Sequence, residues 1–595
     1  MARAVTSIST TTKLDDAPPA AAAVALRVAL IGNVDAGKST LVGVLARGAL
    51  DGGRGEARGG VFTHGHERAT GRTSSVGREI MGFDGTGPDA VQVGIISGAP
   101  TSAAATAAAG GEKELPERLR WAAVMGRCSG GRGAVISLLD LCGHEKYLKT
   151  TIFGLTALRP DLAIVAVAAN RDEIDHMTRE HIGIACSLQV PLCVVLTKVD
   201  MAPPPVLKAT RAALVRLLRS TCKKPLFVGA SAVADDAVAA ASGAAGAAAE
   251  RAENPAVLQA VAAVGGGRIT PVFSISSVTG AGINALRAFL RLAAAQPPPS
   301  DPWPGLSLRP PMGHVKPTPL QQQGQEQAQH QPLSAAAAAA AAGGRAAIDA
   351  VYHVPGIGVV VGAFVSAGQV SAGDACLVGP DTTGGFLRAT IRSVQLHTTD
   401  VAGVSAGQSA TFALRFLDKA SKKVARKGRA KHQTAVSKGM VLVSCAQSHA
   451  RGGGAASLRP PMEVSSSFEA NMLVLHHQTT IGVGSEAVIH CGATRQVAKV
   501  VHIRKAGLAI KPSADAPAPK LRTGDRACVR FRFLLKPECI PPGSLCLFVQ
   551  GRTKALGRIM RVVEDSIPAS ASPLAASSSG AGAALQQRKR EKSTC

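Results

Sequence analysis

The sequence predicts an α/β domain with a doubly wound, mostly parallel sheet, followed by two small β-barrels. Apolar, strand-like runs alternate with helical stretches from about residue 26 to 296, which is the pattern of a doubly wound α/β domain. Further along, the chain changes to short β-rich runs separated by glycine turns. That spacing is typical of small barrels, and we expect one over 347–446 and a second over 464–564.

The first apolar run, 28–31, ends in a glycine-rich turn that predicts a phosphate-binding loop. Residues 32–40 carry G-N-V-D-A-G-K-S-T, which fits G-x-x-x-x-G-K-[ST] between a strand and a helix. The glycines let backbone N–H groups point at a β-phosphate, the lysine reaches the β- and γ-phosphates, and the serine ligates Mg²⁺. The candidate residues are Gly32, Asn33, Val34, Asp35, Ala36, Gly37, Lys38, Ser39 and Thr40.

The identity of the nucleotide base is predicted from T-K-V-D at 197–200, which follows the apolar strand 191–196. An aspartate at this turn accepts hydrogen bonds from guanine N1–H and the 2-amino group, which adenine lacks. A lysine beside it can lay its aliphatic stem along the base, and small residues after strand 271–275 can offer backbone N–H groups to guanine O6. The candidate guanine-site residues are Thr197, Lys198, Asp200, Ser276, Ser277 and Val278.

Two segments between the loop and the base predict a metal and γ-phosphate sensor. A strand over 134–139 delivers D-L-C-G-H, in which Asp140 lies near Mg²⁺ and the Gly143 N–H contacts the γ-phosphate. Upstream, G-R-T-S-S at 71–75 is expected to be a mobile loop that closes on the metal through Thr73. The predicted metal ligands are therefore Ser39, Thr73 and Asp140.

His144 is the candidate catalytic residue. It directly follows the glycine of the D-x-x-G motif, next to the expected position of the attacking water. GTP hydrolysis needs mainly positioning and charge stabilisation, and an imidazole can orient water. Ras-like GTPases carry Gln at this place, whereas His is typical of the translational class.

The segment D-L-C-G-H-E-K-Y-L-K-T-T at 140–151 resembles the GTP-binding protein 1/2 family, relatives of elongation factor Tu and elongation factor 1-alpha. The resemblance extends from about residue 27 to 563. It implies GTP hydrolysis with Mg²⁺ and action on the ribosome, with aminoacyl-tRNA as a further candidate partner. Other matching segments are 32–40, 71–77, 197–200, 473–481 and 551–559.

The sequence departs from the elongation factors at two places. These factors usually have Asn at the position of Thr197 and Cys-Pro at 141–142, where this chain has Leu-Cys. The first change replaces a side-chain amide with a hydroxyl, which we expect to loosen guanine binding. The resemblance implies that the GTP-binding protein 1/2 family tolerates both changes.

Composition limits location and partners. The formal charge of +26 favours a polyanion such as ribosomal RNA or tRNA. No apolar run is long enough to span a bilayer. The 12 cysteines are scattered, as expected for reduced thiols in a cytoplasmic protein. We expect the protein to be a monomer. The dense basic run 422–431 is a solvated loop or a phosphate contact. Residues 1–25, 297–346 and 566–595 are expected to be disordered, the last as a basic tail.

The pattern as a whole predicts a translational GTPase acting in elongation, rescue or surveillance, roles that it does not separate. A GTP-gated scaffold in mRNA turnover or protein interaction, without tRNA delivery, is the alternative. A GTPase that activates sulfate shares the fold but fits the 140–151 segment less well. Asp35 is a further hypothesis, as a ligand for a monovalent cation beside the phosphates.

Overall fold

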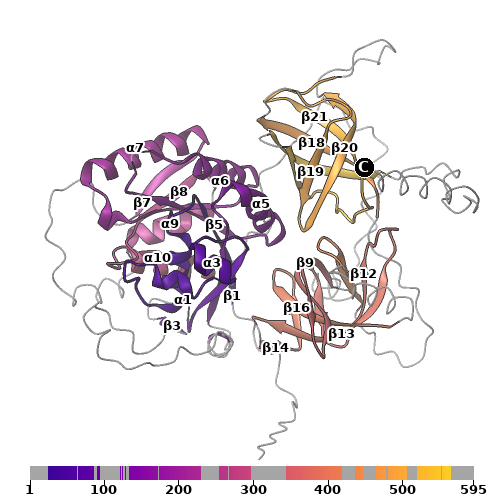
Figure 1. The fold of residues 1–595 in the computed structure, drawn as a ribbon, viewed down its shortest axis with the longest axis horizontal. Helices are drawn as coiled ribbons and strands as arrows, with labels where there is room; N and C mark the ends of the chain where they lie inside the picture. Colours follow the sequence, from indigo (N-terminus) through magenta and orange to yellow (C-terminus); the bar gives the residue numbers. More distant parts are fainter. Residues whose placement is uncertain are drawn as a thin grey trace, which may run out of the picture.

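The computed structural model describes most of the chain as three bodies of regular structure (Figure 1). The described residues are 24–62, 64–85, 90–93, 121, 124, 128, 133–171, 173–228, 254–265, 267–296, 344–397, 399–417, 436–445, 464–476, 480–505, 519–550 and 553–563. The basic run 422–431 and the terminal segment 566–595 lie outside these residues, as do most of 1–25 and 297–346.

The first body is an α/β domain. Its described strands are β1 (Val24–Gly32), β2 (Gly77–Phe83), β3 (Gln92–Val93), β4 (Ala134–Asp140), β5 (Leu162–Ala168), β6 (Leu192–Thr197), β7 (Lys224–Val228) and β8 (Ile269–Ser274). Its described helices are α1 (Lys38–Arg47), α2 (Glu56–Gly59), α3 (Gly65–Thr70), α5 (Leu148–Ala157), α6 (His176–Ser187), α7 (Pro204–Ser220), α9 (Pro255–Gly265) and α10 (Ile283–Ala295), with 3₁₀ turns η1 (Glu145–Tyr147) and η2 (Val199–Met201).

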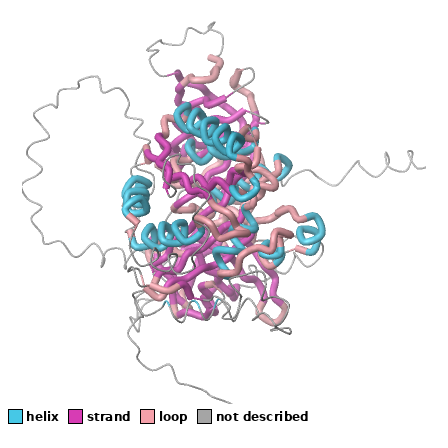
Figure 2. Tube along the Cα trace, turned by 90° about the vertical axis from the view of Figure 1, so that its left-hand side faces the viewer, coloured by secondary structure: helices cyan, strands magenta, loops and turns pink. Residues whose placement is uncertain are grey.

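The described strands of this domain form one sheet in the order β3-β2-β4-β1-β5-β6-β8-β7. Only β2 and β3 are antiparallel to their neighbours. Side chains alternate across β1, so Val28 and Leu30 pack with α1, α9 and α10, while Ala29 and Ile31 pack with α5, α6 and α7. Figure 2 shows the helices flanking the strands. This confirms the predicted doubly wound, mostly parallel sheet.

Two β-barrels follow (Figure 1). The first contains β9 (Arg345–Val354), β10 (Gly358–Ala367), β11 (Gln369–Ser371), β12 (Ala375–Gly379), β13 (Leu387–Leu396), β14 (Thr399–Val401), β15 (Gly403–Ser405), β16 (Ser409–Phe416) and β17 (Val441–Cys445). The second contains β18 (Ser467–His476), β19 (Glu486–Cys491), β20 (Thr494–Lys505), β21 (Arg526–Phe533), β22 (Leu545–Gln550) and β23 (Thr553–Val563).

Both barrels close through one strand pair. Pairing of β12 with β13 closes the first, and pairing of β18 with β23 closes the second, whose core stacks Phe468, Phe531 and Phe548. The first strand of the α/β domain, β1, starts at Val24, and the first strand of the first barrel, β9, starts at Arg345. In the described part of the chain, no helix is long and apolar enough to cross a membrane.

The sheet order creates the place where a ligand can bind. In the sheet, β1 has β4 on one side and β5 on the other. Strands β2 to β4 lie on the first side and β5 to β8 on the second, so β1 lies at a switch in strand order. In doubly wound sheets, ligands bind outside the carboxyl ends of the strands at such a switch. The carboxyl ends of β1, β4, β6 and β8 carry Gly32, Asp140, Thr197 and Ser274. The predicted motifs therefore meet at one edge of the sheet.

The α/β domain contacts both barrels. The guanidinium groups of Arg27 and Arg159 lie 4.6 and 5.5 Å from the ring centre of Phe364 on β10. Arg78, at the start of β2, donates a 2.9 Å hydrogen bond to the buried carboxylate of Asp349 on β9. On the other barrel, Leu547, Val549 and Leu556 pack into the core on the α5–α6 side of the sheet. The first barrel thus contacts arginines of the α/β domain, and the second barrel contacts the α5–α6 side of its sheet.

We predict that the Arg78–Asp349 pair stabilises docking of the first barrel. Arg78→Ala leaves the Asp349 carboxylate, whose side chain is 1% exposed, without its cation. We expect the free energy of unfolding to fall by about 2 kcal/mol, because an unpaired buried charge is costly. Urea denaturation would measure this, with Arg388→Ala, at an exposed arginine of the same barrel, as the control. Equal midpoints for both variants would contradict the prediction.

Candidate nucleotide site

The turn after β1 has the backbone of a phosphate-binding loop. Gly32 and Gly37 adopt φ values of 136° and 79°, and Asp35 adopts 59°, all in the region that L side chains rarely enter. A Cβ on Gly32 would overlap the carbonyl oxygen of Ala166 on β5. Gly37 then caps α1 at its N-terminal end. Glycine is therefore required at both ends of the loop, and the helix begins with its positive end toward the loop's hollow.

Lys38 lies inside this loop. Its ammonium donates a 2.7 Å hydrogen bond to the Asn33 carbonyl oxygen. Burial lowers the pKa of Lys38, and the nearby Asp140 carboxylate opposes that shift. A Cβ on Gly143 would lie 2.7 Å from the carbonyl oxygen of Gly32 and 2.5 Å from the lysine ammonium, so the D-x-x-G glycine is needed for its close approach to the loop. The structure brings the lysine and this glycine together, as the motifs predict.

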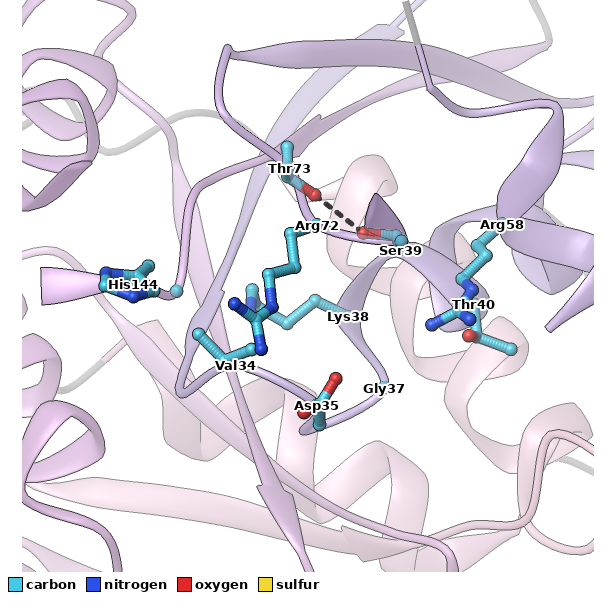
Figure 3. A pocket seen from close by; sticks show the side chains of 12 residues that line it. Val34, Asp35, Gly37, Lys38, Ser39, Thr40, Arg58, Arg72, Thr73 and His144 are labelled. Atoms are coloured by element: carbon cyan, nitrogen blue, oxygen red, sulfur yellow. Dashed lines mark hydrogen bonds between the residues drawn. The ribbon is translucent and has the colours of Figure 1, made fainter. Parts of the chain in front are cut away.

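Ser39, Thr73 and Asp140 converge on one point. The Ser39 hydroxyl donates to Asp140 Oδ2 at 2.6 Å, and the Thr73 hydroxyl donates to the same oxygen at 3.0 Å. The two hydroxyls lie 3.0 Å apart, the contact drawn as a dashed line in Figure 3. The other oxygen, Asp140 Oδ1, is buried and has no hydrogen-bond partner within the described residues. Burial raises the pKa of Asp140, while Lys38 and both hydroxyls oppose the shift.

This oxygen cluster fits a magnesium ion. Mg²⁺ prefers one or two carboxylates together with hydroxyl, phosphate and water oxygens. A buried carboxylate oxygen without a partner beside two hydroxyls supplies that donor set. The three predicted metal ligands come from α1, the 71–76 loop and β4, and only the fold brings them together.

A cavity opens over the loop, and its walls include most of the predicted phosphate site (Figure 3). Three of its residues were not predicted from the sequence: Arg58 of α2, Gly71 and Arg72. Arg72 was detectable, because it stands beside Thr73 in the motif, whereas nothing in the sequence marks Arg58. The lining residues are Val34, Asp35, Gly37, Lys38, Ser39, Thr40, Arg58, Gly71, Arg72, Thr73, Gly143 and His144.

A second cavity adjoins the first on the side of His144. Val34, Asp35, Arg72 and His144 line both cavities. The second is completed by Asn33, Glu145, Arg171 and Met177. Asp35, the candidate cation ligand, is exposed and faces both spaces.

His144 is exposed at the rim, across the first cavity from Thr40 and Arg58 (Figure 3). Its Nδ1 accepts a 3.1 Å hydrogen bond from the Lys146 backbone N–H, and its ring lies edge-on to Tyr147. When Nδ1 accepts a hydrogen bond in a neutral imidazole, Nε2 carries the proton. The local backbone thus fixes one tautomer and orients the ring.

Thr197 supports the phosphate loop from β6. Its hydroxyl donates to the Ala36 carbonyl oxygen at 2.9 Å and lies 3.3 Å from the Val167 carbonyl oxygen. The side chain is buried against the loop, and its Cβ lies 3.7 Å from the position of a Cβ on Gly37. The hydroxyl that stands where elongation factors have an amide therefore bridges the loop to the sheet.

The expected guanine-site residues lie at the ends of the paired strands β6 and β8. Lys198 adopts a left-handed φ of 58°, and Asp200 is exposed in η2. The Val199 N–H donates to the Ile275 carbonyl oxygen at 3.3 Å. The Ser276 hydroxyl accepts from the N–H groups of Val278 and Thr279, which shapes the turn at 276–279. The fold brings the two segments together, although neither lines the two cavities.

Glu67 holds the 71–76 loop in place, a role that the sequence analysis missed. Its carboxylate, buried on α3, accepts hydrogen bonds of 2.7–3.0 Å from the backbone N–H and hydroxyl groups of Ser74 and Ser75. Burial alone would raise the pKa of Glu67, but bonds from Ser74, His64 and Ser75 lower it to about 2. The expected mobile loop is thus anchored beside Thr73. Its signal was H-x-x-E at 64–67, where both halves of a capping box are present.

His181 is the other residue that the sequence did not mark. It is fully buried on α6, and its Nδ1 accepts a 3.0 Å hydrogen bond from the Gly32 N–H. Burial and the charge of Lys38 lower the pKa of His181 to about 3. The ring is therefore neutral near pH 7 and can accept from the first glycine of the loop.

Comparison with known proteins agrees with this geometry. Residues 24–296 match the model of the elongation factor Tu GTP binding domain. GTP-binding protein 2 of Mus musculus is 34% identical over 541 residues, which cover 90% of this chain and 69% of that protein. The chain belongs to the GTP-binding protein 1/2 family. Its α/β domain is in addition similar to the GTP binding domain of elongation factor Tu.

The chain is also similar to a second GTP-binding protein, to an elongation factor and to a solved GTPase-like domain. GTP-binding protein 1 of Xenopus laevis is 35% identical over 92% of this chain, which spans 65% of that relative's length. Elongation factor 1-alpha of Cenarchaeum symbiosum is 27% identical over 37% of this chain and 45% of its own. Among solved structures, the S. cerevisiae Ski7 GTPase-like domain bound to GTP shares the fold, with a TM-score of 0.54 at 10% identity over 91% of this chain and 98% of its own.

We predict that Glu67 makes the stability of the chain pH-dependent. Its pKa is about 2 when folded, below the ordinary 4.5, so its contribution is present above pH 4.5 and is lost as the pH falls through about 2. Glu67→Gln should cost on the order of 2 kcal/mol at neutral pH. The difference from wild type should fall by about half at pH 3, as measured by urea denaturation at each pH. A difference that does not change with pH would argue against this role.

We also predict that the Thr197 hydroxyl supports nucleotide binding. Thr197→Val keeps the shape of the side chain but leaves the Ala36 carbonyl oxygen without its donor. We expect affinity for GTP to fall by about tenfold, the equivalent of one hydrogen bond. Isothermal titration would measure it, with Thr156→Val, whose hydroxyl bonds within α5, as the matched control. Unchanged affinity in Thr197→Val would refute the role.

Proposed function

We propose that this chain binds GTP with Mg²⁺, hydrolyses it, and acts as a translational GTPase on the ribosome. The observation that carries the proposal is the convergence of Ser39, Thr73 and Asp140 beside Lys38. These groups come from the phosphate loop, the 71–76 loop and the D-x-x-G strand. They are the parts that a GTPase must bring together before it can respond to a γ-phosphate.

Each part of the site has a distinct role in this proposal. The 32–40 loop and Lys38 hold the β- and γ-phosphates, and Asp200 with the 276–278 turn selects guanine. Bound Mg²⁺ would neutralise charge on the phosphates, held by Ser39, Thr73 and Asp140. His144, with its tautomer fixed by the Lys146 N–H, positions the attacking water.

The 71–76 loop links the nucleotide to the first barrel. The Thr73 hydroxyl donates to Asp140, and Arg78, five residues further along the chain, binds Asp349 of β9. Loss of the γ-phosphate would release Thr73, and the change would reach the barrel through this ion pair. Such a coupling is how a bound nucleotide changes the affinity of the barrels for a partner.

The partner proposed here is the ribosome, with aminoacyl-tRNA as a further candidate. Similarity to elongation factors Tu and 1-alpha supports this choice, and so does the formal charge of +26, which favours contact with RNA phosphates. Binding should then weaken as salt rises.

The test is GTP turnover by the purified chain, with and without cytosolic ribosomes, for wild type and His144→Ala. We expect ribosomes to raise turnover by about a hundredfold and the substitution to abolish that rise while GTP affinity is kept. His176→Ala is the matched control, because this exposed α6 histidine lines neither cavity.

Two results would point elsewhere. Tight GTP binding without ribosome stimulation would favour a GTP-gated scaffold in mRNA turnover or protein interaction. Full stimulation in His144→Ala would keep the ribosome as partner but remove this histidine from the water-positioning role.

A further inference from the structure

Arg72 projects into the nucleotide cavity from a backbone that is fixed on both sides. Before it, the Gly71 N–H donates a 2.7 Å hydrogen bond to the Glu67 carbonyl oxygen. After it, Thr73 contacts Asp140, and Ser74 is held by the Glu67 carboxylate. Because the backbone on both sides of Arg72 is fixed, its side chain reaches the site without further ordering of the backbone. This is the condition for preorganised charge stabilisation.

The Arg72 side chain lies where the γ-phosphate and the attacking water are expected. It lines both cavities, as does His144. In Figure 3 it extends beside Lys38, between Val34 and Asp35, on the side of the cavity nearer to His144. Arg72 is exposed and makes no hydrogen bond or ion pair within the described part of the chain. Its five N–H donors are therefore available to a ligand.

The other cationic side chains at this site have different positions and contacts. Lys38 is held by the Asn33 carbonyl oxygen inside the loop. Arg58 lies beside Thr40 in Figure 3, with its guanidinium close to Gly55 and Gly71. Arg171, at the second cavity, is paired with Asp175 at 2.9 Å. Within the described residues, the Arg72 guanidinium is thus unpaired, and it lies on the side of the cavity nearer to His144.

We propose that Arg72 is a catalytic residue that stabilises the transition state of GTP hydrolysis from within the same chain. In this reaction the water oxygen bonds to the γ-phosphorus while the bond from that phosphorus to the β–γ bridging oxygen breaks. The electron pair goes to the β-phosphate, which leaves as GDP, and the proton of the water goes to the inorganic phosphate. Charge builds on the bridging and γ-oxygens, where a bidentate guanidinium is most effective.

This inference rests on the proposed GTP hydrolysis but does not need the ribosome. The experiment compares wild type, Arg72→Ala, Arg72→Lys and Arg54→Ala by single-turnover GTP hydrolysis, with and without ribosomes. Arg54 is the control, because it is exposed and lines neither cavity. A second readout is binding of GDP with aluminium fluoride, which mimics the transferring phosphoryl group, measured against binding of GDP alone.

We expect Arg72→Ala to lower kcat by about a hundredfold or more, since arginines in this role contribute large factors. Its KM for GTP and its affinity for GDP should stay within about threefold of wild type. Enhancement of GDP binding by aluminium fluoride should disappear. Arg72→Lys should recover only part of the rate, because an ammonium lacks the planar fork. Arg54→Ala should behave as wild type.

Three results would overturn the assignment. One is an unchanged kcat in Arg72→Ala. Another is an equal loss of GDP affinity and rate, which would make Arg72 only a ground-state contact. The third is aluminium fluoride binding that survives in Arg72→Ala. Absence of ribosome stimulation in wild type would count against the translational role alone, because the single-turnover rate and the aluminium fluoride binding still report on Arg72.

Discussion

The buried carboxylate of Asp140 is the interaction on which the site depends. It ends β4, accepts hydrogen bonds from Ser39 and Thr73, and opposes the burial-driven fall in the pKa of Lys38. A carboxylate with one oxygen left without a partner is costly unless a cation completes it. The protein sustains this cost because α1, the 71–76 loop and the sheet all meet at this carboxylate. Each of the three is thereby placed relative to the others, and the cavity is formed between them.

The supports of the site are as informative as the residues that face the ligand. Glu67 holds the 71–76 loop, Thr197 ties the phosphate loop to β6, and His181 accepts from the Gly32 N–H. None of these three lines the cavities. They act by fixing backbone groups whose positions decide how well the phosphates and the metal are bound. Glu67 also fixes the loop that carries Arg72, while the Lys146 N–H orients His144.

Contacts between the α/β domain and the barrels connect the nucleotide site to the barrels. Arg78 follows the anchored loop and binds a buried aspartate of the first barrel, while the second barrel packs against the α5–α6 side of the sheet. A rearrangement of the 71–76 loop would therefore reach the interface with the first barrel through Arg78. A nucleotide bound at one edge of the sheet can in this way influence surfaces formed by the barrels.

The sequence by itself determined the fold class, and its motifs predict the phosphate, metal and guanine sites, because these depend on local patterns: strand, glycine turn, helix, and residues at strand ends. The tertiary structure decided which distant groups share a contact. The motifs predict that Thr73 joins Ser39 and Asp140 at one metal, and the structure supplies the contacts among them. Sequence spacing does not show that Glu67 anchors Ser74 and Ser75, or that a buried imidazole receives the Gly32 N–H. The physical reason is that hydrogen bonds form between atoms about 3 Å apart, whatever their separation along the chain, and only the packed sheet and helices set those distances.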